Sequence, residues 1–166
     1  IRVAAINCAD PLNGPTCKAN GVEYFPFIKY FPKNASEPST SSLIHSSHSL
    51  AQMRETLTKH VMDDYSVNRF DNWPNFDFLN NMVAYSELWN ESKGSADHIA
   101  IVFENHPSSL TGAQLLLDLS PFKDRLYARR ALKNHNLVEA FKLTDFPTIL
   151  IFKKGQKVPV VQAELR

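Results

Sequence analysis

The residues best suited to chemistry in this sequence are its two cysteines, Cys8 and Cys17, because a thiolate is the nucleophile of thiol–disulfide exchange. They are spaced more widely than the Cys-x-x-Cys pair that lowers a thiol pKa at the start of a helix, and no Cys-x-x-Cys occurs anywhere in the sequence. We therefore expect a structural disulfide between Cys8 and Cys17. A redox-active pair and two free thiols are the alternatives.

Two Phe-Pro steps, Phe25-Pro26 and Phe146-Pro147, stand directly before apolar runs. Proline lacks the N–H group that a sheet ladder needs, so it belongs at the first residue of a strand. Around each step the order is the same: an apolar run, a polar stretch, Phe-Pro, and a second apolar run. This repeat predicts two copies of one kind of domain.

Two N-glycosylation sequons begin at Asn34 and Asn90. Together with the even number of cysteines, they favour the secretory pathway, meaning the Golgi, the endoplasmic reticulum or the extracellular space. The net charge of the 166 residues is +1, which favours neither nucleic acid nor an anionic membrane surface as partner. We therefore predict no nucleic-acid partner.

Histidines are the other candidate ligands. His45 and His48 lie in a serine-rich stretch without a third or fourth ligand at the spacing of a structural zinc site. His106 stands alone in a turn and is expected at the surface. We predict no metal site.

The elements that position these residues begin with a buried strand at 2–7, followed by turns and a strand at 27–31. Between that strand and the next helix, residues 32–47 read as a surface loop. The helix should begin after Ser49, since Ser49 and Gln52 fit a capping box. The short polar segment between Cys8 and Gly21 can hold one helical turn, near Thr16–Ala19.

The second part of the chain predicts an α/β order. Aromatic and apolar residues at roughly helical spacing indicate a helix within 76–91. The elements expected after it are a buried strand at 98–104, a helix at 111–122, a strand at 126–132, a short helix at 136–142, and a hairpin of 148–154 and 158–161.

This order, with Phe-Pro before the last hairpin, resembles the thioredoxin fold. The resemblance implies an α/β fold class of tandem thioredoxin-like folds, of which the first is incomplete at its N-terminus. It also implies that Pro26 and Pro147 follow cis peptide bonds, which the low frequency of cis X-Pro bonds alone would not predict.

Longer stretches are similar to the quiescin sulfhydryl oxidase family. The similarity to its first thioredoxin domain lies in Val3-Ala4-Ala5-Ile6-Asn7-Cys8, in the spacing to Cys17, in Phe25-Pro26 and in the helix containing Met53-Arg54-Glu55-Thr56-Leu57. Trp73-Pro74 is similar to the linker. The second domain is matched by Ile101-Val102-Phe103-Glu104, Leu117-Asp118-Leu119-Ser120, Ala128-Arg129-Arg130-Ala131-Leu132 and Thr144-Asp145-Phe146-Pro147.

The resemblance implies three regions: residues 1–65 as the C-terminal half of a first thioredoxin-like domain, 66–75 as a linker, and 76–166 as a second domain without Cys-x-x-Cys. The parent protein would be an FAD-dependent thiol oxidase acting on reduced secretory proteins, with FAD on a domain outside this sequence. A Cys-x-x-Cys is expected about 20 residues before Ile1, one helix and one connection away.

Roles follow from the resemblance residue by residue. Phe25 and Pro26 are expected to face client proteins, with a rigid turn that only shapes the fold as the alternative. Phe146 and Pro147 are expected to shape the fold only, because their domain has serine but no cysteine at the strand-to-helix turn 105–109. This chain alone is expected to carry no catalytic residue, bind no cofactor and be inactive.

Two rival functions stay open. One is a non-catalytic, client-binding module of a protein disulfide isomerase-like protein, and the other is a degenerate paralogue without oxidase activity. We also expect the isolated chain to be poorly stable, because the strands at 3–6 and 27–31 have incomplete neighbours.

Overall fold

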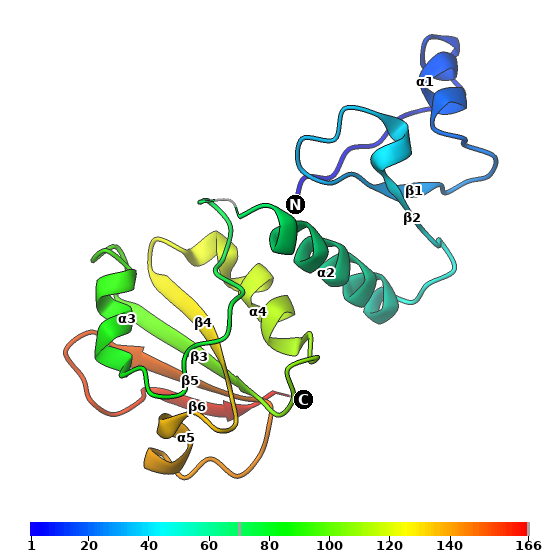
Figure 1. Ribbon diagram of the computed structural model, residues 1–166. Coiled ribbons are helices and arrows are strands. Elements are labelled where there is room, and N and C mark those ends of the chain that lie inside the picture. Colours follow the sequence, from blue (N-terminus) through cyan, green and yellow to red (C-terminus); the bar gives the residue numbers. More distant parts are fainter. Residues whose placement is uncertain (70, 166) are drawn as a thin grey trace. The chain divides into compact units, whose positions relative to one another are not determined.

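The computed structural model describes residues 1–69 and 71–165 and divides the chain into two compact units, Ile1–Asp64 and Tyr65–Arg166 (Figure 1). We call them unit 1 and unit 2 and describe each by itself. The boundary falls inside a helix. No helix in the described ranges is both long and apolar enough to cross a membrane.

Unit 1 has little regular structure. Its elements are η1 (Pro11–Asn13), α1 (Gly14–Ala19), β1 (Ile28–Tyr30), η2 (Pro38–Thr40), β2 (Ser42–Ile44) and the beginning of α2 (Leu50–Val67). β1 and β2 pair antiparallel, with Ile28 opposite Ile44. Ile44 of β2 and Val61 of α2 are both nearly inaccessible to solvent. The small core of this unit therefore includes one residue of the hairpin and one of the helix.

The capping box that the sequence predicts at the start of α2 is confirmed. The backbone N–H of Ser49 donates to Gln52 Oε1 at 2.8 Å, and the N–H of Gln52 donates to Ser49 Oγ at 3.3 Å. These reciprocal bonds satisfy two donors that a helix start leaves without partners. Near the other end of the helix, Asp64 accepts from Tyr30 Oη at 3.3 Å and from the N–H of Lys33 at 3.0 Å. α2 is thereby tied to the end of β1 and the residues after it.

Two predictions for unit 1 are wrong. Residues 2–7 form no strand, and Val3 is 94% exposed. Apolar residues become a strand only where a neighbouring strand completes the ladder, and within the described residues nothing pairs with 2–7. In addition, the predicted loop 32–47 contains the strand β2, which the serine-rich sequence does not reveal because its pairing with β1 is what defines it.

The predicted linker 66–75 overlaps α2, which continues to Val67. After it, Arg69 forms an ion pair with Asp77, and Tyr65 Oη lies 3.2 Å from Asn75 Oδ1. The Tyr65 ring also packs edge-on against Phe76, with ring centroids 5.1 Å apart. These contacts join the helix end to the first residues of the following segment.

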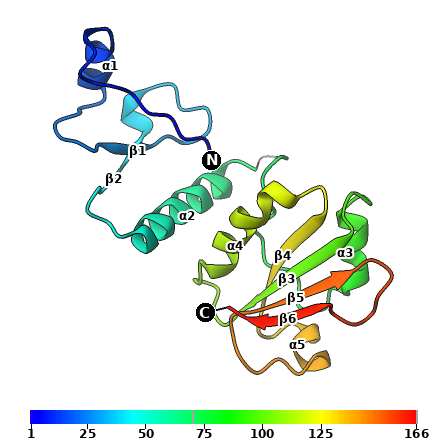
Figure 2. The same ribbon diagram turned by 180° about the vertical axis from the view of Figure 1, so that it is seen from behind.

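Unit 2 holds a four-stranded sheet in the order β4-β3-β5-β6 (Figures 1 and 2). The strands are β3 (His98–Glu104), β4 (Leu126–Leu132), β5 (Thr148–Lys153) and β6 (Val161–Glu164). β3 and β4 are parallel and are connected through α4 (Thr111–Leu119) and η3 (Ser120–Phe122), whereas β5 and β6 form an antiparallel hairpin. The remaining helices are α3 (Tyr85–Glu91) and α5 (Asn136–Ala140).

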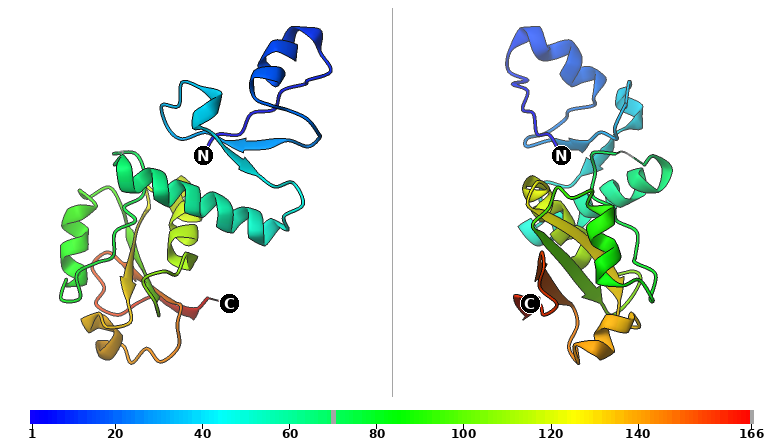
Figure 3. Two further views of the ribbon diagram at one scale, coloured as in Figure 1. Left: turned by 45° about the vertical axis from the view of Figure 1, so that its right-hand side comes forward. Right: turned by 90° about the vertical axis from the view of Figure 1, so that its left-hand side faces the viewer.

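Side chains of β3 alternate between two buried faces. Ile99, Ile101 and Phe103 belong to one core cluster with Leu88 of α3 and Leu137 of α5. The intervening residues therefore face the other side, where Glu104 contacts α4. Figure 3 shows α4 on one side of the sheet and α3 and α5 on the other. A strand covered on both faces is largely apolar, and residues 99–103 of β3 are apolar without interruption.

Several predictions for unit 2 need correction. The helix expected within 76–91 is limited to α3, because Phe78 forms an isolated parallel bridge with Arg130 at the outer edge of β4. The aromatic residues of this segment nevertheless contribute to the core, since Phe76 is 1% exposed and Tyr85 and Trp89 pack against the main core cluster. The expected helical segment 111–122 is confirmed as α4 followed directly by η3, whereas the helix expected at 136–142 ends at Ala140. The last strand is Val161–Glu164 instead of 158–161, because its register with β5 sets its position.

Candidate functional site

Cys8 and Cys17 are joined by a disulfide in unit 1, with Cα atoms 6.0 Å apart. The bond closes a loop that contains η1 and the beginning of α1, which continues past Cys17 to Ala19. Asp10 accepts from the N–H of Leu12 at 2.9 Å and caps η1, and the N–H of Val22 donates to the carbonyl of Cys17 at 3.1 Å. Cys17 is buried, whereas Leu12 at the tip of the loop is 87% exposed. Neither cysteine is free in this state.

The Phe25-Pro26 peptide bond in unit 1 is cis. Phe25 is 74% exposed and Tyr24 is 41% exposed, so the loop presents aromatic surface to solvent. The ring of Tyr24 packs edge-on against Phe27, with ring centroids 5.2 Å apart. This loop therefore presents an apolar side chain that the unit does not use in its own core.

The Phe146-Pro147 bond in unit 2 is also cis, but its surroundings differ. Phe146 is half-buried and packs against the main core cluster. Thr148 Oγ1 donates to the carbonyl of Asp145 at 2.5 Å and braces the loop. Because Thr148 pairs with Phe103, Pro147 lies at the same end of the sheet as the turn 105–109.

The turn 105–109 is predicted to carry no redox chemistry. It contains serine instead of cysteine, and His106 Nδ1 lies 2.7 Å from Ser108 Oγ. His106 is exposed, as predicted. Serine is not a nucleophile in thiol–disulfide exchange, so the turn holds no group that could carry electrons.

A buried ion pair, Glu104–Arg130, lies immediately before the turn, and the sequence did not predict it. Glu104, which has no exposed surface, accepts from the N–H of Gly112 at 2.8 Å and from Arg130 Nη1 at 3.4 Å. Arg130 Nε donates to the carbonyl of Phe76 at 2.6 Å, and its guanidinium lies 4.0 Å from the ring centroid of Phe78. Burial lowers the pKa of Arg130, and the charge of Glu104 opposes that shift.

The neighbouring arginine points to the other face of β4. Arg129 forms an ion pair with Glu91 of α3, and Tyr127 Oη donates to the same carboxylate at 2.9 Å. Burial and this hydrogen bond raise the pKa of Tyr127. The signal for both networks is present in the sequence: two consecutive arginines inside a predicted strand must face opposite sides of a covered sheet, and each then needs an anionic partner.

A further buried polar group is His135, which is 2% exposed. Its Nδ1 accepts from the N–H of Leu137 at 3.2 Å and caps α5, while its ring packs edge-on against Phe103 at 5.9 Å. Burial lowers the pKa of His135, and the backbone of Asn80 opposes the shift. Nε2 makes no hydrogen bond of standard geometry with the residues described.

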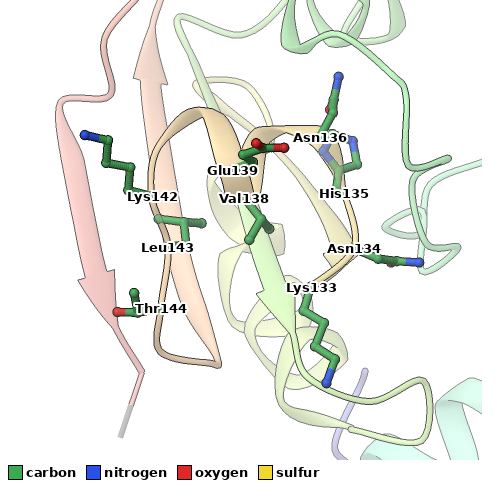
Figure 4. A pocket seen from close by; sticks show the side chains of 9 residues that line it. All are labelled: Lys133, Asn134, His135, Asn136, Val138, Glu139, Lys142, Leu143 and Thr144. Carbon is green, nitrogen blue, oxygen red and sulfur yellow. The ribbon is translucent and has the colours of Figure 1, made fainter.

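A shallow hollow of about 460 Å³ opens beside this histidine (Figure 4). Figure 4 shows the side chains around it, which are Lys133, Asn134, His135, Asn136, Val138, Glu139, Lys142, Leu143 and Thr144. The lining offers no aromatic carbocycle or indole on which a flavin ring could stack, so these residues do not fit FAD. Among residues 1–69 and 71–165, no three histidine, cysteine or acidic side chains converge as metal ligands.

The predicted glycosylation sites are both exposed. Asn34 lies in a turn with a φ of 66°, and Asn90 lies in the last turn of α3. Their surroundings differ at the third sequon residue. Ser36 is exposed, whereas Ser92 is 5% exposed and donates its hydroxyl to the carbonyl of Trp89 at 2.8 Å.

Comparison with solved structures supports the fold. Two crystal structures of ERdj5, form II and form I, align with 96% of this chain and 20% of theirs, with TM-scores of 0.53 and 0.51 and sequence identities of 12% and 10%. At this identity the likeness concerns the fold alone. Together with the sheet order and the two cis-proline loops, it establishes a mixed α/β, thioredoxin-like architecture.

Sequence comparison identifies relatives. Sulfhydryl oxidase 1 from Cavia porcellus is 28% identical over 97% of this chain and 26% of its own length, and the Rattus norvegicus protein is 29% identical over 97% of the chain and 21% of its length. Sulfhydryl oxidase 2 from Homo sapiens is 26% identical over 93% of the chain. The chain thus spans about a quarter or less of these curated relatives.

The family model described as QSOX Trx-like domain matches residues 86–166, which include the sheet of unit 2. The similarity to sulfhydryl oxidase 1 covers 97% of the chain and therefore extends through unit 1 as well. The chain is therefore similar to sulfhydryl oxidases along nearly its whole length, and its residues 86–166 match the thioredoxin-like domain of the quiescin sulfhydryl oxidase family.

Proposed function

We propose that this chain is part of a flavin-linked sulfhydryl oxidase that introduces disulfides into client proteins. In that reaction two client thiols lose two electrons and two protons and become a disulfide, while oxygen accepts both and becomes hydrogen peroxide. The observation that carries the proposal is similarity to several sulfhydryl oxidases along 96–97% of the chain. The Cys-x-x-Cys pairs and the FAD site are assigned to parts of the longer protein outside these residues.

Unit 1 supplies a surface that faces client proteins. Extended peptides are commonly bound through backbone hydrogen bonds together with pockets or surfaces for alternate side chains. The loop of Phe25 and Pro26 suits that mode because the Phe25 side chain is 74% exposed and Tyr24 beside it is partly exposed. Clients would be unfolded or reduced secretory proteins, whose apolar side chains are accessible.

Unit 2 serves as a scaffold and spacer that helps to position the catalytic domains. Its four-stranded sheet, covered on both faces, gives it the larger core of the two units. It contains no cysteine, and its own cis-proline loop packs against that core. A covered sheet without cysteine suits the role of a spacer.

The proposed setting is the secretory pathway, in the Golgi, the endoplasmic reticulum or outside the cell. A disulfide between Cys8 and Cys17 persists in such oxidising compartments. Asn34 and Asn90 would carry N-linked glycans there, since both side chains are exposed.

The proposal is tested on the full-length protein of which this chain is part. We expect bound flavin in the absorption spectrum, and oxygen uptake that yields one hydrogen peroxide for each disulfide formed in a reduced protein substrate. Residues 1–166 alone should consume no oxygen under the same conditions.

Two results would contradict the proposal. A flavin-free full-length protein that binds unfolded clients would support the protein disulfide isomerase-like alternative. A full-length protein that neither binds flavin nor oxidises thiols would support a degenerate paralogue.

A further inference from the structure

The end of β3 is unusual because a carboxylate follows five apolar residues into the core. Glu104 has no exposed surface, and an isolated buried carboxylate would be strongly destabilising. Here it accepts from the N–H of Gly112 at 2.8 Å and from Arg130 Nη1 at 3.4 Å. Glu104 is thus held by one helix donor and one buried cation.

The helix donor belongs to the start of α4, which has nine residues. Its N-cap residue, Leu110, makes no side-chain capping bond. Two acceptors from outside the helix take that place: Ser109 Oγ accepts from the N–H of Thr111 at 3.4 Å, and Glu104 accepts from the next N–H, that of Gly112. The Ser109 hydroxyl and the Glu104 carboxylate therefore lie on successive donors of one helix end.

Such a helix end is a favourable place for an anion, because unpaired N–H groups and the helix dipole both point at it. The same setting lowers the pKa of a cysteine and makes its thiolate reactive. In unit 2 this position already contains a negative charge, which comes from the protein itself and is balanced by Arg130.

The space is shaped for that carboxylate. A Cβ atom added to Gly112 would lie 2.4 Å from Glu104 Oε2 and 2.7 Å from its Cδ. Any residue other than glycine would have to displace the carboxylate from the helix end. The absence of a side chain at Gly112 therefore leaves the space that the Glu104 carboxylate occupies.

We propose that Glu104 is a built-in anion that occupies the N-terminus of α4 and keeps this turn from activating a thiolate, even where a cysteine is placed in it. The inference goes beyond the scaffold role proposed above. On that view unit 2 is redox-silent for two reasons, the absence of cysteine and the presence of an internal charge at the position that a thiolate would need.

The test uses the Ser109→Cys variant of the 166-residue chain. Its thiol is the single free one, since Cys8 and Cys17 are paired and the sequence has no other cysteine. The pH dependence of its alkylation by iodoacetamide gives the thiol pKa. We expect a pKa no lower than the ordinary value of about 8.5. Adding Glu104→Gln should lower it by about one unit or more, because the carboxamide keeps the acceptor for Gly112 but removes the like charge.

The matched control is Ser108→Cys, one residue earlier and exposed, whose pKa should change little when Glu104→Gln is added. Circular dichroism of each variant shows whether the native fold is kept. The proposal is overturned if Ser109→Cys has a strongly lowered pKa while Glu104 is intact. It is equally overturned if Glu104→Gln leaves that pKa unchanged in a folded chain. Should Glu104→Gln not fold, the first measurement decides alone.

Discussion

The two Phe-Pro loops share a peptide geometry and differ in what surrounds it. Both bonds are cis. Phe25 in unit 1 is 74% exposed beside a small core, whereas Phe146 in unit 2 is half-buried and packs against the main core cluster. The Phe-Pro step thus has the same backbone geometry in both units. Its surroundings decide whether the phenylalanine is available to a partner or packs in the core.

The largest expected effect concerns how unit 1 is stabilised. Replacing Cys8 and Cys17 by serine should lower the free energy of unfolding of unit 1 by about 2.5–3 kcal/mol, since the disulfide closes a short loop. Unit 2 contains no cysteine and should keep its stability. Amide hydrogen exchange followed by residue separates the two units. Equal loss of protection in both would contradict this division.

The next effect compares the two phenylalanines directly. Phe146→Ala should destabilise unit 2 by about 2 kcal/mol, because a half-buried ring is removed from the core. Phe25→Ala should change the stability of unit 1 by less than about 0.5 kcal/mol, as expected for an exposed side chain. Denaturant titration of the two variants measures both values. A larger loss for Phe25→Ala would reverse the assignment of roles.

Two helical glycines, one in each unit, differ in the space around them. Gly112→Ala should destabilise unit 2 by about 1–3 kcal/mol, because the new methyl group collides with Glu104. Gly14→Ala in α1 meets nothing within 4 Å and should be neutral or stabilise unit 1 by up to about 1 kcal/mol. Thermal unfolding of each variant gives the sign. Stabilisation by Gly112→Ala would argue against the tight fit around Glu104.

The smallest effect is the response of unit 2 to acid. Burial lowers the pKa of His135 in the folded state, so the unfolded chain binds a proton more readily as the pH falls. This contribution to stability is complete above about pH 6.5 and is lost progressively below it. The ring faces Phe103 and the backbone of Asn80, whereas Lys133 and Glu139 lie on the rim of the neighbouring hollow.

His135→Asn is the matched variant for this effect. Asparagine can also cap α5 through its side-chain oxygen, but it does not titrate in this range. Chemical denaturation between pH 5 and 8 should show a smaller loss of stability on acidification in His135→Asn than in the unmodified chain. Parallel pH profiles of the two proteins would rule out His135 as the source.

Sequence reasoning predicts the elements of unit 2 better than those of unit 1, for a physical reason. His98–Glu104 and Leu126–Leu132 are defined by their own apolar pattern and are confirmed residue for residue. Residues 2–7 have an equally apolar pattern but no paired neighbour, and β2 has a neighbour but no apolar pattern. Strands are made by pairing, which a single segment does not encode.

The candidate site also contains features that the sequence reveals and one that it does not. Cysteines, Phe-Pro steps and sequons are visible as residue types, so the sequence analysis named them. The Glu104–Arg130 pair was missed because its members are 26 positions apart and only the sheet brings them together. A buried charge at the end of an apolar strand is nevertheless a signal, since it requires a partner somewhere in the fold.

The most direct test of the contrast between the two loops is a comparison of substrates in the full-length protein. We predict that Phe25→Ala lowers kcat/KM for a reduced protein client about tenfold, as expected for loss of one apolar contact worth more than 1 kcal/mol, and leaves kcat/KM for dithiothreitol unchanged. Phe146→Ala should leave the ratio between the two substrates unchanged. If Phe25→Ala affects both substrates equally or neither, its loop does not face clients.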